Sequence, residues 1–183
     1  MTMQQLRENV TTTRECVARL VPVGTEILIP GDVQVTITQA LGGSFTVLIN
    51  GNLARIDESD ADALGKPASS SIDVSAYTGT ALTDQDIYQV MRSVYDPEIP
   101  VNIVDLGLVY HVDCHRTRTG YRVHVQMTLT AAGCGMGQVI TEEVRQKVLR
   151  LPRVEEARVD LVFDPPWDMA MVSEEAQLEL GLI

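Results

Sequence analysis

The sequence predicts an α+β protein with two domains: a small β-barrel or sandwich-like domain, then an α-β-β-α-β domain. Before residue 65, short runs of alternating apolar and polar residues are separated by turn signals. After residue 80, a helical apolar period precedes further alternating runs. Residues 65–71 between them are rich in small and breaking residues, as linkers are. We expect a β-rich domain at 1–65, a linker at 66–80, an α+β domain at 81–168 and a C-terminal extension with a short helix at 169–183.

Turn residues separate the strands expected in the first domain. A short apolar run at 26–29 ends at Pro30-Gly31, and Asn50-Gly51 is a tight hairpin signal. Two runs alternate as half-buried strands do: Val33, Val35 and Ile37, then, after the Gly42-Gly43 turn, Phe45, Val47 and Ile49. Residues 59–62 (SDAD) are typical of a capped helical turn, which we favour over a calcium loop because EF-hand ligand spacing is missing.

The second domain begins with a helix. Thr83 and Asp86 resemble a capping box, with Asp in place of the usual Glu. The apolar face of this helix then comprises Ile87, Val90, Met91 and Val94. A second helix, ended by Pro152, has Val139, Ile140, Val144, Val148 and Leu151 on its apolar side. A third strand with Ala157, Val159, Leu161 and Phe163 follows, and Ser173 is expected to cap a final helix that includes Leu178 and Leu180.

Two alternating segments between these helices predict a hairpin. One apolar face holds Leu106, Leu108, Tyr110, Val112 and Cys114, and the other holds Tyr121, Val123, Val125, Met127 and Leu129. Matching the faces sets Cys114 opposite Tyr121, and the same register sets Asp113 opposite Arg122 and Asp105 opposite Thr130. Asp105 is therefore expected at the end of the hairpin where the chain enters the Gly133-Cys134-Gly135 turn.

Cys134 is the main candidate for chemistry. It lies between two glycines, just before a helix whose first N–H groups and dipole stabilise a thiolate. The thiolate is the form that binds metal or attacks an electrophile. The alternative is a small cysteine that fills a tight strand-to-helix turn, since free cysteines are usually buried and inert.

Other candidate residues carry weaker signals. All three histidines fall on the polar face of the hairpin, and His111 and His124 face each other in the predicted register. Without a third ligand this pair is a weak metal site. Cys114 is expected in the core, Cys16 has no assigned role, and Trp167 either lines a pocket or pins the tail. No Walker loop, HExxH or GxSxG motif occurs.

Composition and charge narrow the class of partner. The net charge of −11 argues against nucleic acid or an anionic membrane as the main partner. No apolar run reaches the roughly 18 residues that a membrane helix needs. The polar N-terminus and three widely spaced cysteines without a CxxC motif indicate a cytoplasmic protein in a reducing environment.

Four ordered motifs resemble the iron–sulfur cluster assembly domain shared by the SufT family, PaaD and the eukaryotic cytosolic iron–sulfur targeting factor. They are DPEIP at 96–100, VDLGLVY at 104–110, MTLT at 127–130 with Gly133-Cys134, and DPPW at 164–167. The first domain is similar to that of SufT proteins through QALGGSFTV at 39–47 and LARID at 53–57, and the tail at 173–182 resembles SufT endings. The segment between Trp167 and Ser173 is slightly short for the family.

The resemblance implies a maturation factor that helps to deliver iron–sulfur clusters from scaffold or carrier proteins to client apoproteins. It makes Cys134 the cluster-handling residue, with Asp105 beside it and Thr130, Gly133, Gly135 and Trp167 in support. One thiolate cannot enclose a cluster, which usually takes four cysteine ligands. Three arrangements stay open: a second Cys134 across a homodimer, transient cluster holding, or engagement of a partner's thiol.

Two other functions are compatible with the same residues. One is a thiol-dependent enzyme with Cys134 as nucleophile and Asp105 as base. The other is a protein-binding adaptor whose β domain docks partners while Cys134 is structural. The resemblance favours the assembly factor over an enzyme.

Overall fold

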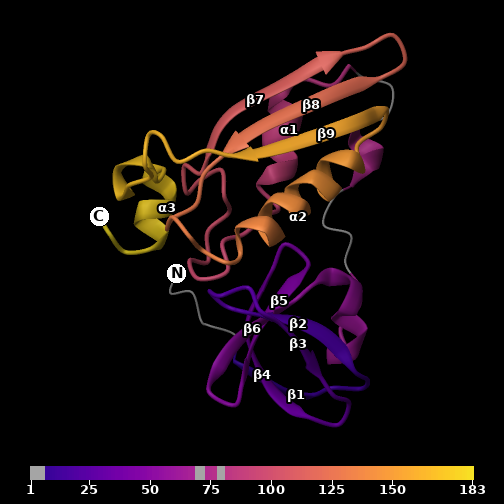
Figure 1. Cartoon of the computed structure of the whole chain (residues 1–183), viewed down its shortest axis with the longest axis vertical. Helices are drawn as coiled ribbons and strands as arrows, with labels where there is room; N and C mark the ends of the chain where they lie inside the picture. Colours follow the sequence, from indigo (N-terminus) through magenta and orange to yellow (C-terminus); the bar gives the residue numbers. More distant parts are fainter. Residues whose placement is uncertain (1–6, 69–72, 78–80) are drawn as a thin grey trace. The chain divides into compact units, whose positions relative to one another are not determined.

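The structure is a computed structural model that describes residues 7–68, 73–77 and 81–183. The chain divides into two compact units, residues 1–71 with 97–100 and residues 72–96 with 101–183, each combining strands with helical turns or helices (Figure 1). Much of the expected linker, at 69–72 and 78–80, lies outside the described residues, as do residues 1–6. Within the described ranges, none of the helices combines the length and apolarity needed to span a membrane.

The first unit is one six-stranded antiparallel sheet with strand order β1-β4-β5-β6-β2-β3. Both glycines of the Gly42-Gly43 turn, and Asn50 and Gly51, have positive φ, which confirms the two predicted turns. The strands are β1 (Glu8–Thr11), β2 (Cys16–Leu20), β3 (Glu26–Ile29), β4 (Gln34–Leu41), β5 (Ser44–Ile49) and β6 (Asn52–Ile56).

Small and branched apolar side chains form the core of this unit. Val35, Ile37 and Val47 are buried, as their alternation predicts. Cys16, left unassigned from the sequence, lies in β2, only 3% exposed, and packs in the same cluster. Burial raises the pKa of the Cys16 thiol, which keeps it protonated and unreactive.

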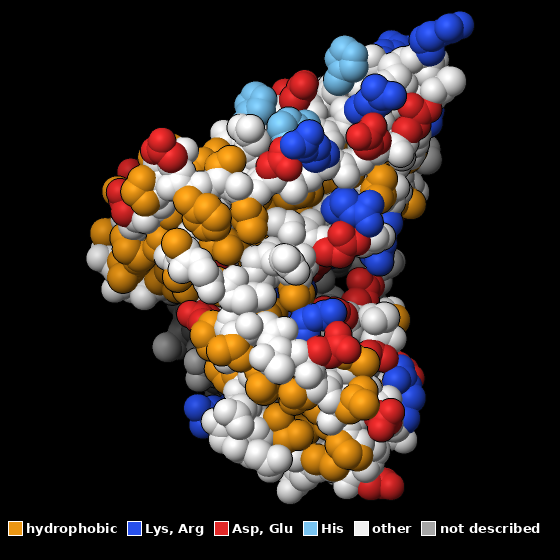
Figure 2. All heavy atoms as spheres, viewed as in Figure 1, with side chains coloured by type: hydrophobic (Ala, Val, Ile, Leu, Met, Phe, Trp, Pro, Cys, Tyr) orange, Lys and Arg blue, Asp and Glu red, His pale blue; other side chains and the backbone are white. Residues whose placement is uncertain are grey.

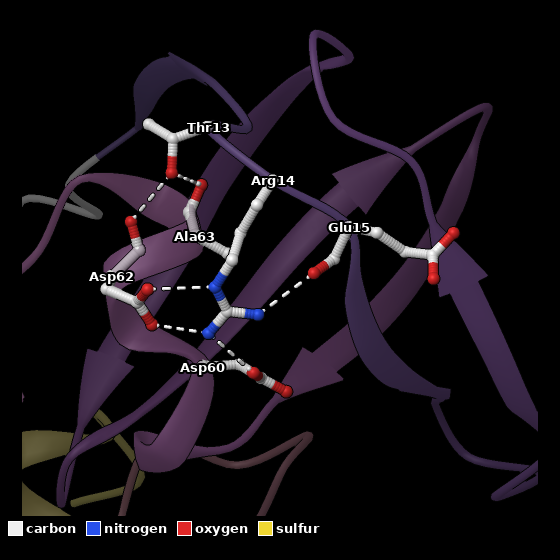
Figure 3. Close-up of polar contacts among 6 residues, drawn as sticks. All are labelled: Thr13, Arg14, Glu15, Asp60, Asp62 and Ala63. Atoms are coloured by element: carbon white, nitrogen blue, oxygen red, sulfur yellow. Dashed lines mark hydrogen bonds and ion pairs between the residues drawn. The ribbon is translucent and has the colours of Figure 1, made fainter.

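Hydrogen bonds and ion pairs of Arg14 join the segment between β1 and β2 to the helical turn η1 (Glu58–Leu64). Figure 3 shows the Arg14 guanidinium against the Asp62 carboxylate, with Nε and Nη2 donating over 2.8 and 2.5 Å, while Nη2 also reaches Asp60. The predicted helical turn is thus confirmed, but it begins at Glu58 and Asp57 in the N-cap position makes no side-chain capping bond. Asp60 and Asp62 bind Arg14 instead.

The second unit is a three-stranded sheet with two helices on one side (Figure 1). Strands β7 and β8 are antiparallel and β9 runs parallel to β8. Buried side chains of both helices, including Ile87, Val90, Ile140 and Val144, form the core with Val123 and Val125 of β8. The elements are η2 (Val74–Tyr77), α1 (Asp84–Met91), β7 (Val109–Arg116), β8 (Tyr121–Met127), α2 (Gly137–Leu149), β9 (Val154–Leu161), η3 (Met169–Met171) and α3 (Glu174–Glu179).

Capping residues begin the first and last helices as predicted. The Asp86 carboxylate accepts a hydrogen bond of 2.7 Å from the Thr83 N–H, so the capping box ahead of α1 is confirmed. The Ser173 hydroxyl accepts from the Ala176 N–H at 3.2 Å and caps α3. Leu178 lies within α3, whereas Leu180 is its C-cap residue.

The hairpin register differs from the predicted one. Cys114 faces Val123 rather than Tyr121, and Asp113 faces His124 rather than Arg122. From His111 to Arg116, the slip of two residues leaves every side chain on its predicted face, so the apolar pattern could not distinguish the two registers. The pairing is also irregular between Val109 and His111, which the alternation did not indicate.

Candidate functional site

Three segments that carry the motifs leave the second sheet at the same end. Val109 at the start of β7 pairs with Met127 at the end of β8, and Met127 is level with Leu161 at the end of β9. The Leu108 carbonyl accepts a hydrogen bond of 2.8 Å from the Thr128 N–H, just beyond the strands. The segments that hold Asp105, Cys134 and Trp167 therefore adjoin the same end of the sheet.

Asp105 lies in a turn at residues 102–107, hereafter the Asp105 turn, before β7 begins. It is not in a strand, so the predicted pairing with Thr130 is wrong. The Asn102 side-chain oxygen accepts from the backbone N–H groups of Val104 and Asp105 at 3.1 and 2.9 Å. Such Asx turns hold a backbone bend without a helix or strand.

Both carboxylate oxygens of Asp105 have partners. Asn102 Nδ2 donates to Oδ2 over 2.6 Å, and the Arg92 guanidinium forms an ion pair with Oδ1. The Asp105 side chain is 23% exposed, so these charge-assisted bonds are partly shielded from water. Asp105 thus ties the turn to the end of α1 at Arg92. This arrangement suits an anchor better than a general base.

The C-terminal segment packs against the Asp105 turn. The Trp167 indole donates to the Leu106 carbonyl over 2.7 Å, and the Ser173 N–H donates to the Asp105 carbonyl over 2.8 Å. Gly107 has a φ of +75°, and a Cβ there would lie 2.8 Å from the carbonyl carbon of Met171 and closer to its oxygen. The Trp167 hydrogen bond is a contact of the kind that the predicted pinning role requires.

Cys134 lies in a short exposed loop between β8 and α2. Its side chain is half-buried, while Gly133 and Gly135 on either side are exposed and Thr130 is half-buried. Gly133 has a φ of +84°, and a Cβ there would meet no atom within 4 Å. The left-handed backbone favours glycine, and it leaves open space beside the cysteine.

The start of α2 sets the position of the cysteine along the chain. Gly137 is the first helical residue, and a Cβ there would lie 2.8 Å from Leu129 Cδ1, so the helix packs closely on the sheet. The Gly137 N–H donates to the Cys134 carbonyl over 3.1 Å. The first turn of α2 has no acidic side chain, so none of its own residues offsets the positive end of the helix dipole near Cys134.

The predicted histidine pair is wrong. His111 faces Gln126, and His124 Nε2 lies 2.8 Å from the Asp160 carboxylate of β9. Among the described residues, no group of three or more His, Cys, Asp or Glu side chains could hold a metal ion. Cys114 is half-buried rather than fully in the core, and burial, together with Asp84, raises its thiol pKa.

Sequence reasoning missed Arg92 and Asn102. Asn favours Asx turns because its side chain accepts from the backbone N–H two residues on, and this local preference could have found Asn102. Arg92 meets Asp105 across 13 residues from the end of a helix. The tertiary fold brings Arg92 and Asp105 together, and no local sequence pattern predicts this contact.

Comparisons with known proteins identify the family of this chain. The profile of the family described as "Iron-sulfur cluster assembly protein" matches residues 84–161. An "Fe-S protein maturation auxiliary factor" of Porphyromonas gingivalis is 50% identical over 55% of this chain and 93% of its own length. The "Fe-S protein maturation auxiliary factor SufT" of Staphylococcus aureus is 38% identical over 49% of this chain and 98% of its own length.

Two further matches are a carrier protein and a solved structure. A protein named "Iron-sulfur cluster carrier protein" from Mycobacterium bovis is 37% identical over 43% of this chain, which is 21% of that relative. A solved structure of a domain of unknown function from Bacillus anthracis shares 36% identity over 55% of this chain and 92% of its own, with a TM-score of 0.47.

The chain belongs to the iron–sulfur cluster assembly protein family, as the motifs predicted. The profile covers residues 84–161, which belong to the second unit except for residues 97–100, and each relative described above matches about half of the chain. The resemblance of the first domain to SufT proteins therefore stays a prediction.

Proposed function

We propose that this protein is an iron–sulfur maturation factor that passes clusters to client apoproteins through Cys134. One observation carries the proposal: Cys134 lies half-buried between two exposed glycines, at the end of the sheet where the segments that hold Asp105 and Trp167 also lie. Small neighbours give a partner protein access to the sulfur. The names of the relatives, maturation factor and cluster carrier, support the same role.

The cluster is cargo in this proposal. The donor set that Cys134 offers is one thiolate, whereas iron–sulfur clusters usually take four cysteine ligands. A second chain's Cys134 across a homodimer, or thiols of scaffold, carrier or client proteins, would supply the rest. Transient holding fits a factor that must also release its cargo, and a reducing cytoplasm would keep the thiol competent.

A thiol enzyme is less well supported. That mechanism needs Asp105 as a base, yet Arg92 and Asn102 already bind the two carboxylate oxygens of Asp105. In our proposal, Asp105 and Trp167 position the turn next to the cysteine loop, and Thr130, Gly133 and Gly135 shape that loop.

We also propose that the first unit is a small barrel-like domain. Residues from five of its strands and η1 share one buried cluster, and Val10 of β1 packs against it. The Thr12 hydroxyl, just after β1, donates to the Pro30 carbonyl, just after β3, over 2.7 Å. Since β1 and β3 are the two outer strands of the sheet, this contact favours a sheet that curls toward closure.

The test replaces the native gene with a Cys134→Ser version and measures aconitase activity in extracts under iron limitation. We expect the Cys134→Ser strain to lose aconitase activity while the level of the variant protein stays normal. Chemical reconstitution of the cluster in the extract should then restore the activity. A Cys114→Ser version is the matched control and should keep activity. Full activity of Cys134→Ser, where deletion of the gene lowers it, would make the cysteine structural.

A further inference from the structure

The C-terminal part of the second unit exposes an unusual number of large apolar side chains. We call residues 162–183 the tail segment. Figure 2 shows hydrophobic side chains gathered over this part of the molecule, with acidic side chains at its margins. Single exposed apolar residues are ordinary, but a gathered set marks an interaction surface. The tail residues concerned are Phe163 (46% exposed), Met169 (46%), Leu178 (63%), Leu182 (50%) and Ile183 (68%).

The inner side of the tail segment is firmly attached to its own unit. Val172 and Ala176 are buried, and the Ser173 N–H is bonded to the Asp105 carbonyl at 2.8 Å. The Gln177 side-chain amide donates to the Val172 carbonyl over 2.8 Å, and the backbone carbonyl of Gln177 accepts from the Leu182 N–H at 2.9 Å. The exposed leucines therefore project from an ordered support, which lowers the entropy cost of binding a partner.

The charge of the tail segment indicates the chemistry of its partner. From residue 159 to residue 183 the sequence has no Lys, Arg or His. A second copy of this chain, with its net charge of −11, or an anionic membrane would bring like charges together. A basic partner segment would be attracted. The same stretch has six acidic residues: Asp160, Asp164, Asp168, Glu174, Glu175 and Glu179.

We propose that the tail segment binds a peptide segment of another protein in which apolar side chains are flanked by Lys or Arg. Leu178 and Leu182 form the apolar centre, and the exposed glutamates of α3 form the charged rim. This inference deepens the proposed function and rests on it for the identity of the partner, a client or donor of clusters. Such a partner would dock on the segment that holds the Asp105 turn.

A phage-displayed library of random linear peptides, selected on the full-length protein, tests the proposal. Enriched peptides should combine apolar residues with flanking Lys or Arg. A synthetic copy should bind Leu178→Ser/Leu182→Ser at least about tenfold more weakly than wild type, because central apolar anchors dominate such interfaces. Leu28→Ser is the matched control, since Leu28 is 61% exposed in β3 of the first unit, and it should bind as wild type does. Added salt should weaken binding.

Two results would refute the docking proposal. One is that the double variant binds the peptide as tightly as wild type, and the other is that the enriched peptides show no bias toward Lys or Arg. A dimer seen by light scattering that the double variant loses would assign the surface to a second copy instead. An unchanged circular dichroism spectrum and urea midpoint establish that the double variant is folded.

Cys134→Ser separates this inference from the proposed function. It should bind the selected peptide as wild type does while failing in cluster delivery. Normal delivery by Cys134→Ser, with the peptide preference intact, would refute the role of the cysteine and leave the docking surface standing. Failed delivery by Cys134→Ser without any peptide preference would refute the docking surface alone.

Discussion

Gly107→Ala should destabilise the second unit more than an ordinary glycine replacement. Gly107 has a φ of +75°, where a Cβ costs roughly 1–2 kcal/mol. That Cβ would also come within 2.8 Å of the Met171 carbonyl carbon, and overpacking of this kind costs typically about 1–3 kcal/mol more. The expected loss in free energy of unfolding is therefore about 2–5 kcal/mol.

Gly181→Ala separates backbone strain from the clash. Gly181 has a φ of +71°, nearly the same, but a Cβ there would meet nothing within 4 Å. The free energies of unfolding of the two variants should therefore differ only by the cost of the clash, about 1–3 kcal/mol. With a urea m value of about 2 kcal/mol per M, the midpoint of Gly107→Ala should lie roughly 0.5–1.5 M below that of Gly181→Ala.

Trp167 reports this unfolding directly. It is the only tryptophan of the chain and donates to the Asp105 turn, next to Gly107. Its fluorescence during urea titration therefore follows the contact between the turn and the C-terminal segment. Equal midpoints for Gly107→Ala and Gly181→Ala would refute the close packing of the turn against Met171.

Three other predictions follow from single contacts. Trp167→Phe removes a hydrogen bond worth about 1 kcal/mol, so Tm from circular dichroism should fall by about 4–8 °C; an unchanged Tm would contradict the pinning role. The hydrogen bond from Arg145 lowers the pKa of the Glu142 carboxyl from 4.5 to about 2. The contribution of the ionised Glu142 to folding stability is therefore complete above pH 4.5 and is lost as the pH falls toward 2. Urea midpoints should show Glu142→Gln less stable than wild type at neutral pH, with the gap closing in acid; a constant gap would contradict this. Brief iodoacetamide labelling of native protein, read by mass spectrometry, should modify Cys134 and spare buried Cys16; equal labelling would contradict the fold.

Local sequence signals were sufficient where a structure depends on neighbouring residues. The Asn50-Gly51 turn and the capping box at Thr83 follow from backbone chemistry within four residues. Strands β1 and β2 were not predicted. Both are short, and β2 buries the small residues Cys16 and Ala18 rather than an alternating row of large ones. Their pairing partners lie elsewhere in the chain, beyond the reach of periodicity.

Long-range geometry explains what was wrong or missing in the second unit. A two-residue register slip preserves both faces of a hairpin, so the apolar pattern could not fix the register. The pattern placed Asp105 at the correct end of the sheet, but Asp105 lies in a turn before β7 and pairs with no strand residue. Phe163 was expected on the apolar face of the third strand, yet β9 ends at Leu161 and Phe163 is 46% exposed. The link from Arg92 to Asp105 depends on how α1 packs, which no local motif reports.

Cluster transfer with purified proteins tests the role of Cys134 most directly. A cluster-loaded scaffold protein and apo-aconitase are mixed anaerobically, and the initial rate at which aconitase activity appears is measured with wild type, Cys134→Ser or Cys114→Ser. We expect wild type and Cys114→Ser to accelerate transfer and Cys134→Ser to leave it at the rate without added factor. Acceleration by folded Cys134→Ser equal to that of wild type would contradict the account.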